Sequence, residues 1–336
     1  MTRPHETTGT ALLSRGNALK ECWKKHPLLL MEGALSERLK QEFHLPTEGP
    51  AGMTGLVRRP DARGALGLLW RQYLAVAERY GMPFLATTPT RRFDRARAKQ
   101  AGYVDTDGAC TLADENMTML RAVRDDADRR GVPMFAGALL GCRGDAYTAE
   151  GCLSAEDSAT FHLWETTLFA RAGADFLYAA LMPALPESLG MARAMAQSGL
   201  PFLMSFTLRA DGRLVDGTPL YEAVDIIDAE VSPRPLCFMA GCVHPAVVMQ
   251  ALSLPMNRTE SVRTRFLGIQ ANAANLPFHA LEHSESIRQS TPEELAQDMK
   301  TLKERFGLRL FGGCCGTTDR HMEVMAAGLT GRSLNA

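Results

Sequence analysis

Two adjacent cysteines, Cys314 and Cys315, stand in the segment 312–318 (GGCCGTT), directly after a short apolar run. Neighbouring Cα atoms are about 3.8 Å apart, which is below the usual range for a disulfide, so the two thiols are not expected to bond to each other. In a regular strand their side chains would point to opposite faces, but a tight turn built by glycines lets both sulfurs converge on one ion. The pattern therefore predicts a turn that presents two metal ligands.

A third thiol, Cys242, follows another apolar run in the segment 240–245 (AGCVHP). Three thiolates with an open fourth position are typical of a catalytic rather than a structural zinc site. Thiolate is a soft ligand, which favours zinc over oxygen-seeking metals. A glycine-rich loop could instead hold a phosphate at a helix N-terminus, but the paired cysteines favour the metal. We expect Zn²⁺ on Cys242, Cys314 and Cys315.

The remaining candidate ligands are expected to be structural. Free cysteine is usually a small buried hydrophobic residue, and we assign this role to Cys22, Cys110, Cys142, Cys152 and Cys237. His244 is expected to face solvent rather than to bind the metal, as loop-end histidines commonly do.

Eight short apolar runs bounded by turn residues alternate with segments of helical period. Continuous apolar runs predict strands buried on both faces, and strands that alternate with helices predict a parallel sheet. The runs are Leu28–Met31, Pro83–Ala86, Pro133–Gly137, Asp175–Ala179, Pro201–Phe206, Leu236–Ala240, Phe266–Gln270 and Leu308–Phe311. Eight such repeats in about 300 residues favour a single-domain α/β fold, a (β/α)8 TIM-type barrel. Its active site would lie at the carboxyl ends of the strands.

The clearest helix follows Thr291, where Pro292 and Glu294 complete a capping box and a stripe of apolar residues continues to Phe306. Further helices are expected at about 65–80, at 155–172, and after Thr317 or Thr318, where Met322, Met325, Ala326 and Leu329 form the inward stripe. Residues 43–64 are expected to form a long loop, and residues 1–10 to be disordered. The predicted divisions are an extension at 1–26, the barrel at 27–330 and a tail at 331–336.

Composition restricts the possible partners. The 336 residues are 46% hydrophobic and 22% charged, and the formal net charge is -1. No block of like charge suggests nucleic acid or an anionic membrane as a partner. The first residues contain no apolar signal segment, so we expect a cytoplasmic protein.

The cysteine segment and its surroundings resemble the homocysteine S-methyltransferase family. The strongest similarity lies in Thr291–Leu295 and in the segment from Phe311 to Thr318 with His321, where the paired cysteines between glycines are highly specific. Weaker similarity covers about residues 28–329, and is carried by Glu32-Gly33-Ala34, His162, Pro183, Glu187, Cys242, Pro245 and Asn272.

The resemblance implies a zinc-bearing barrel that methylates the sulfur of homocysteine to give methionine. A small donor of the S-methylmethionine or S-adenosylmethionine type suits a short chain. The residues that the resemblance places around the substrate are Glu32, Thr88, Ala180 and Asn272. Glu32 is expected to contact an ammonium or other donor group of the acceptor, and Glu187 to lie away from the barrel mouth.

Several positions depart from the family pattern. Ala180-Leu181 replaces Glu-Thr, and Thr88-Pro89-Thr90 replaces Thr-Asn-Thr. Glu32 replaces Asp, while Met239 and Gly241 replace Gly and Asn before the first zinc cysteine. Because loss of a buried charged partner costs about 2–5 kcal/mol, homocysteine is expected to be a poor acceptor unless another residue compensates, and a thiol with a more apolar end to be better.

Two other functions fit the sequence. The barrel could be one component of a corrinoid-dependent system and take the methyl group from a separate cobalamin protein. Alternatively, it could be a non-catalytic zinc-bearing barrel that binds a thiol or a partner.

Overall fold

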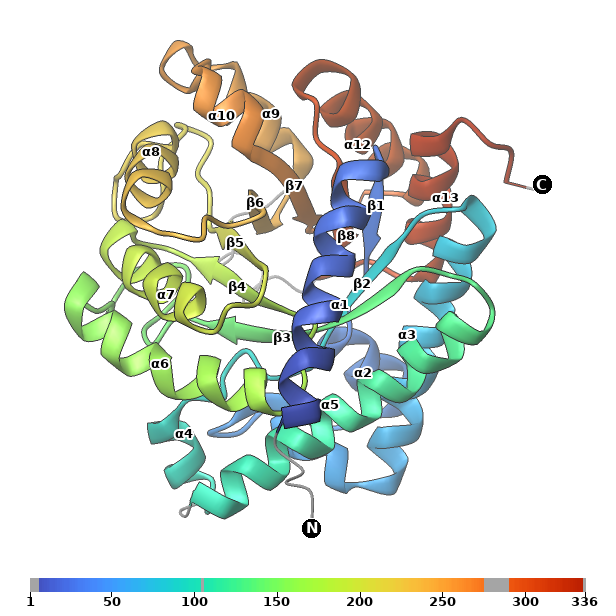
Figure 1. Cartoon of the computed structure of the whole chain (residues 1–336). Helices are drawn as coiled ribbons and strands as arrows, with labels where there is room; N and C mark the ends of the chain where they lie inside the picture. The colour runs from blue at the N-terminus through green and yellow to red at the C-terminus, as the bar shows by residue number, and fades with distance from the viewer. Residues whose placement is uncertain (1–5, 104–105, 275–289, 335–336) are drawn as a thin grey trace.

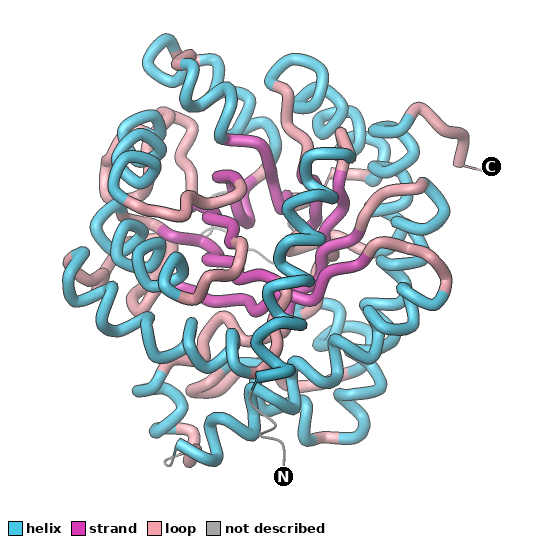
Figure 2. The backbone as a smooth tube through the Cα atoms, in the orientation of Figure 1, coloured by secondary structure: helices cyan, strands magenta, loops and turns pink. Residues whose placement is uncertain are grey.

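The computed structural model describes residues 6–103, 106–274 and 290–334. Within them, eight parallel strands close into a barrel in chain order, and the last strand pairs with the first through Leu29↔Leu310 and Leu30↔Phe311. Figures 1 and 2 show the strands as a central ring with the helices around it. The predicted (β/α)8 barrel is confirmed.

All eight apolar runs coincide with strands, and all but β1 and β5 continue beyond the predicted ends. The extension of β6 places Cys242, expected just past that strand, inside it. The strands are β1 (Leu29–Met31), β2 (Phe84–Thr87), β3 (Met134–Gly141), β4 (Phe176–Met182), β5 (Phe202–Phe206), β6 (Cys237–Val243), β7 (Phe266–Ala271) and β8 (Leu310–Gly313). Most of their residues are fully buried, because the barrel interior covers one face and the outer helices cover the other.

The described helices lie outside the strands. They are α1 (Glu6–Lys25), α2 (Ser36–Phe43), η1 (Gly52–Arg58), α3 (Pro60–Tyr80), α4 (Arg95–Gln100), α5 (Thr106–Arg129), α6 (Ala155–Arg171), α7 (Leu185–Gln197), α8 (Leu220–Glu230), α9 (Pro245–Ser253), η2 (Pro255–Asn257), α10 (Glu260–Arg265), α12 (Pro292–Phe306) and α13 (Asp319–Thr330). The helices predicted at 65–80, 155–172 and after Thr291 correspond to α3, α6 and α12.

The capping predictions are also confirmed. The Thr291 hydroxyl accepts from the Glu294 amide (3.2 Å), and the Glu294 carboxylate accepts from the Thr291 amide (2.9 Å). Thr318 precedes α13, and the predicted stripe of Met322, Met325, Ala326 and Leu329 is buried. These local signals fix where α12 and α13 begin.

Two expected irregular segments contain helices. The segment 43–64 includes η1 and the start of α3, because the Asn116 side-chain amide donates to the Thr54 carbonyl (3.0 Å) and Pro60 starts the next helix. Residues 6–10, expected to be disordered, belong to the 20-residue helix α1. Residues 1–5 lie outside the described ranges.

Helix α1 covers the amino-terminal end of the barrel (Figure 1). A Cβ at Gly16 would lie 2.8 Å from Pro201, just before β5, and 3.7 Å from the Asp175 carbonyl, just before β4. Arg309, just before β8, donates to the carbonyls of Trp23 (2.5 Å) and His26 (2.6 Å). This end is closed by packing, so a site must lie at the opposite end.

Candidate active site

Three cysteine sulfurs meet at the carboxyl end of the barrel. Cys242 is the penultimate residue of β6, and Cys314 and Cys315 directly follow β8. The three Sγ atoms lie within 4.8 Å of one another, and the Cys242 and Cys315 sulfurs are 3.4 Å apart. Ligands at 2.3 Å from a tetrahedral zinc ion would be about 3.8 Å apart. The three sulfurs therefore fit a single metal ion with little movement.

An irregularity in β6 directs the Cys242 side chain to this point. Cys242 has φ = 50°, a left-handed conformation that is unusual for a residue other than glycine. The register between β6 and β7 shifts between Gly241 and Val243 at the same place. A bulge of this kind re-aims a side chain at the rim of a barrel. The preceding glycine is required, because a Cβ on Gly241 would lie 2.3 Å from the Ser205 hydroxyl.

The turn that carries the other two cysteines is held by several hydrogen bonds. The Cys314 amide donates to the Ala271 carbonyl (2.7 Å), and the Cys315 carbonyl accepts from the Ala273 amide (2.9 Å). The Thr317 hydroxyl donates to the Cys314 carbonyl (2.7 Å). The same hydroxyl fills the space beside Gly313, where an added Cβ would lie 2.3 Å from the Thr317 Oγ1 atom. The predicted glycine-dependent turn is thus present, and it brings the sulfurs of Cys314 and Cys315 close to that of Cys242.

The charges of the three thiols are strongly linked. Hydrogen bonds from the Cys314 and Cys315 thiols hold the pKa of Cys242 well below its usual value. The same bonds to Cys242 raise the pKa values of Cys314 and Cys315 well above theirs. Cys242 therefore loses its proton easily, whereas Cys314 and Cys315 keep theirs. A bound cation would favour the thiolate form of all three.

Two further side chains hydrogen-bond to the Cys242 sulfur. Tyr147, in the loop after β3, interacts through its phenol and helps to lower the pKa of Cys242. The Asn272 amide nitrogen lies 3.8 Å from the same sulfur, and the Asn272 carbonyl oxygen accepts from the Ala274 amide (2.8 Å). Asn272, expected to touch substrate, thus lies beside the Cys242 sulfur. Sequence reasoning missed Tyr147.

A cavity of about 150 Å³ opens beside the thiols and is lined by Cys242, Cys314 and Cys315. It equals the volume of about five water molecules, which suits one small molecule. Glu32, directly after β1, lines this cavity, and its carboxylate accepts from the Thr87 hydroxyl (2.6 Å) and the Thr87 amide (3.0 Å). Burial raises the pKa of Glu32 to about 8. An ammonium group in the cavity would favour its ionised form.

The other positions expected near the substrate differ in their placement. Thr88 does not line the cavity, because its hydroxyl pairs with that of Thr90 (2.8 Å) inside the wall; Thr87 takes that place. Ala180 and Leu181 do line it. Leu181 has φ = 58° at a register shift in β4, so a second bulge turns an apolar side chain toward the cavity.

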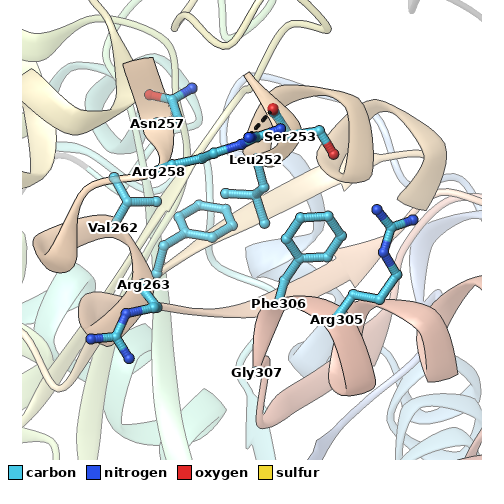
Figure 3. Close-up of a pocket in the computed structure, with 10 residues that line it drawn as sticks. Leu252, Ser253, Asn257, Arg258, Val262, Arg263, Arg305, Phe306 and Gly307 are labelled. Carbon is cyan, nitrogen blue, oxygen red and sulfur yellow. Dashed lines mark hydrogen bonds between the residues drawn. The ribbon is translucent and has the colours of Figure 1, made fainter. Parts of the chain in front are cut away.

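A larger cavity of about 530 Å³ lies elsewhere (Figure 3). It is lined by residues from α9, η2 and α10, by Phe306 at the end of α12 and by Phe266 at the start of β7. Leu252 and Phe306 point toward each other across it. Because it adjoins the start of β7 rather than the ends of β6 and β8, it is separate from the thiols.

A buried charged cluster anchors the loop that carries Tyr147. His162 on α6 is 2.5 Å from Glu165 and 3.2 Å from Glu187 on α7, and all three side chains are buried. Glu187 also accepts from the amides of Arg143 (2.6 Å) and Leu153 (3.3 Å), at the two ends of the loop. Burial alone would lower the pKa of His162, but the two carboxylates raise it to about 9.

The remaining cysteines stay outside the thiol cluster. Cys22, Cys142 and Cys237 are buried, Cys110 and Cys152 are partly buried, and all five are free thiols. His244 is not solvent-facing as expected: it is 6% exposed and caps α9, where its Nδ1 accepts from the Ala246 amide (3.2 Å) and its Nε2 pairs with Ser290 (2.9 Å). The signal was Pro245, which suits the first position of a helix.

The fold and the site together define a (β/α)8 barrel with three clustered thiols at its carboxyl mouth. The homocysteine S-methyltransferase family model matches residues 29–329. The chain therefore belongs to the homocysteine S-methyltransferase family and is a thiol methyltransferase.

Individual relatives agree with this assignment. The chain is 24% identical to the homocysteine S-methyltransferase of Escherichia coli (strain K12) over 94% of this chain and 99% of that protein. It is 32% identical to the methionine synthase of Mycobacterium leprae (strain TN) over 144 residues, which are 41% of this chain and 11% of that protein. The metallated crystal structure of the homocysteine methyltransferase MmuM from Escherichia coli superposes with a TM-score of 0.71, with 21% identity, over 92% of this chain and 99% of that one.

No helix in the described ranges combines the length and apolar character that crossing a membrane requires.

Proposed function

We propose that this enzyme transfers a methyl group from a small sulfonium donor, of the S-methylmethionine or S-adenosylmethionine type, to the thiol of homocysteine or a related small thiol. The observation that carries the proposal is the meeting of Cys242, Cys314 and Cys315 within 4.8 Å beside a cavity large enough for one small molecule. Zinc held by these residues would leave a fourth position for the acceptor sulfur and would stabilise its thiolate near neutral pH.

The chain's own residues would hold the acceptor in place. Glu32 would accept a hydrogen bond from an ammonium group, while its contacts with Thr87 fix the direction of the carboxylate. Leu139, Ala180 and Leu181 give the cavity an apolar wall that limits the access of water. Fixing the sulfur near the donor methyl group is expected to supply much of the rate.

The metal content tests the first half of this proposal. Protein purified under reducing conditions should hold about one zinc per chain, with three sulfurs at about 2.3 Å in its X-ray absorption spectrum. Serine at position 242, 314 or 315 should remove most of the zinc. Cys110→Ser is the matched control, because Cys110 lies on α5 outside the cluster, and it should keep the metal. Full activity without zinc–sulfur scattering would refute the assignment.

Turnover tests the second half. Homocysteine is offered with S-methylmethionine, S-adenosylmethionine or methylcobalamin, and methylated thiol is measured by mass spectrometry. Product with either sulfonium supports the proposal. Product with methylcobalamin alone would support the corrinoid alternative instead.

A further inference from the structure

Arg91 is a charged residue that lines the cavity but takes no part in the proposed methyl transfer. It lies after β2 and lines the cavity together with Glu32 and the three cysteines. Among the described residues, no hydrogen bond or ion pair reaches its guanidinium group. Guanidinium groups are rarely left without an anionic or polar partner at a partly buried position. Within the described ranges, the cavity therefore contains a cation that has no counter-ion within bonding distance.

The nearby acidic side chain of Asp145 does not fill this role. Arg91 is close enough to help lower the pKa of Asp145, but the Asp145 carboxylate accepts from the backbone amides of Tyr147 and Thr148 (both 2.8 Å). That carboxylate shapes the loop after β3 and forms no ion pair with Arg91 in the described part of the chain.

The end of β3 fixes the path of the Arg91 side chain. A Cβ at Gly141 would lie 2.7 Å from Arg91 Cγ and 2.7 Å from the Arg91 carbonyl oxygen. Only glycine leaves room there, so the aliphatic part of Arg91 lies against the backbone of β3. A stem held in this way limits the rotamers of the side chain and lowers the entropy that ligand binding would cost.

The order of the strands around the barrel places Glu32 next to the sulfurs and Arg91 one strand further away. Cys314 and Cys315 follow β8, Glu32 follows the neighbouring β1, and Arg91 follows the next strand, β2. The Gly313 amide donates to the Glu32 carbonyl (3.0 Å), so the first step is a direct contact. A ligand that starts at the sulfurs and runs along this side therefore meets a carboxylate first and a guanidinium second.

We infer that Arg91 binds the carboxylate of the thiol acceptor and thereby selects thiols that carry a carboxylate. This inference rests on the proposed function, because it concerns the same cavity. It also changes the expectation drawn from Ala180 and Leu181, which favoured an acceptor with an apolar end. The cavity contains apolar surface at those two residues and a cationic group at Arg91.

Three methylated thiols separate the two charges without any turnover. Methionine carries an ammonium and a carboxylate, 4-(methylthio)butanoate carries the carboxylate alone, and 3-(methylthio)propylamine carries the ammonium alone. Binding is measured by calorimetry with the purified enzyme. Arg91→Met should weaken 4-(methylthio)butanoate by about 10- to 100-fold, as expected for one charge-assisted contact, and should leave 3-(methylthio)propylamine unchanged. An equal loss for both ligands, or none for the carboxylate, would overturn the inference.

Arg92→Met is the matched control, because Arg92 is the exposed neighbour and does not line the cavity. It should change the affinity for none of the three ligands; a loss as large as that of Arg91→Met would overturn the inference. Arg91→Lys keeps the positive charge but loses the paired donors of the guanidinium group. It should therefore bind 4-(methylthio)butanoate more tightly than Arg91→Met and more weakly than the wild type.

The final measurement is turnover with S-methylmethionine as the donor. Arg91→Met should raise the KM of homocysteine and leave that of the donor unchanged, whereas a rise confined to the donor would overturn the inference. If the enzyme turns over no sulfonium donor but the calorimetric preference holds, the proposed function fails and the carboxylate site stands.

Discussion

The individual residues of the site differ in how far their chemistry depends on burial. Glu32 is 4% exposed, and burial raises its pKa from 4.5 to about 8. Between these two values the unfolded chain releases a proton that the folded chain keeps. The free energy of unfolding should therefore fall as the pH rises from about 4.5 to 8. Burial of this carboxyl group thus lowers the stability of the folded protein as the pH rises above about 4.5.

Glu32→Gln tests this cost and the role of the carboxylate together. Urea unfolding at several pH values should show a smaller loss of stability between pH 4.5 and 8 than in the wild type. The affinity for 3-(methylthio)propylamine should fall by about 10-fold or more, while zinc content stays whole. Glu150→Gln, at an exposed position whose side chain forms no ion pair in the described part of the chain, is the control for the pH dependence. Identical slopes in the wild type and Glu32→Gln would show that this carboxyl does not titrate differently in the two states.

At the scale of the element, the loop between β3 and α6 depends on a cluster that lies outside the cavity. Glu187 on α7 binds amides at both ends of the loop, and His162 joins Glu187 to Glu165. The loop carries Tyr147 to the Cys242 sulfur. Two helices on the outside of the barrel therefore determine the position of a group at the mouth.

His162→Gln should break this arrangement. Loss of one partner from a buried ion pair costs about 3–5 kcal/mol. The pKa of His162 is raised from 6.5 to about 9, so its contribution is complete below pH 6.5 and disappears as the pH rises through 9. Chemical denaturation should show a large gap between wild type and variant at pH 6 that narrows by pH 9.5. A gap that does not change with pH would mean that His162 is uncharged in the folded protein.

The residues of the site differ in whether the sequence alone could predict their positions. Cys242, Cys314 and Cys315 could be found because strand ends and glycine turns are local signals. Tyr147 lies six residues beyond the end of β3, in a loop whose two ends are held by Glu187 on α7. Arg91 depends on the missing Cβ of Gly141. Contacts between elements that are distant in sequence decide both positions, and no periodic pattern encodes them.

At the scale of the whole molecule, the two ends of the barrel have separate tasks. The carboxyl end holds the thiols and the cavity, and the amino-terminal end is closed by α1, which precedes the segment matched by the family model. Leu19 is fully buried and Trp23 is 9% exposed on this helix. The Arg309 guanidinium lies 4.9 Å from the centre of the Trp23 ring and donates to the backbone of the same residue. The helix thus contributes stability at a distance from the chemistry.

Trp23→Ala separates the two ends experimentally. Removal of a large buried aromatic side chain costs about 3–5 kcal/mol, and the cation–π contact with Arg309 is lost as well. The melting temperature should fall by several degrees, whereas zinc content and the KM of the acceptor should stay at wild-type values below that temperature. Lys24→Ala is the matched control, because the Lys24 side chain is 70% exposed on the same helix. A loss of zinc in Trp23→Ala at temperatures where the protein is folded would show that the two ends are coupled, since packing at the amino-terminal end would then govern the spacing of sulfurs at the other.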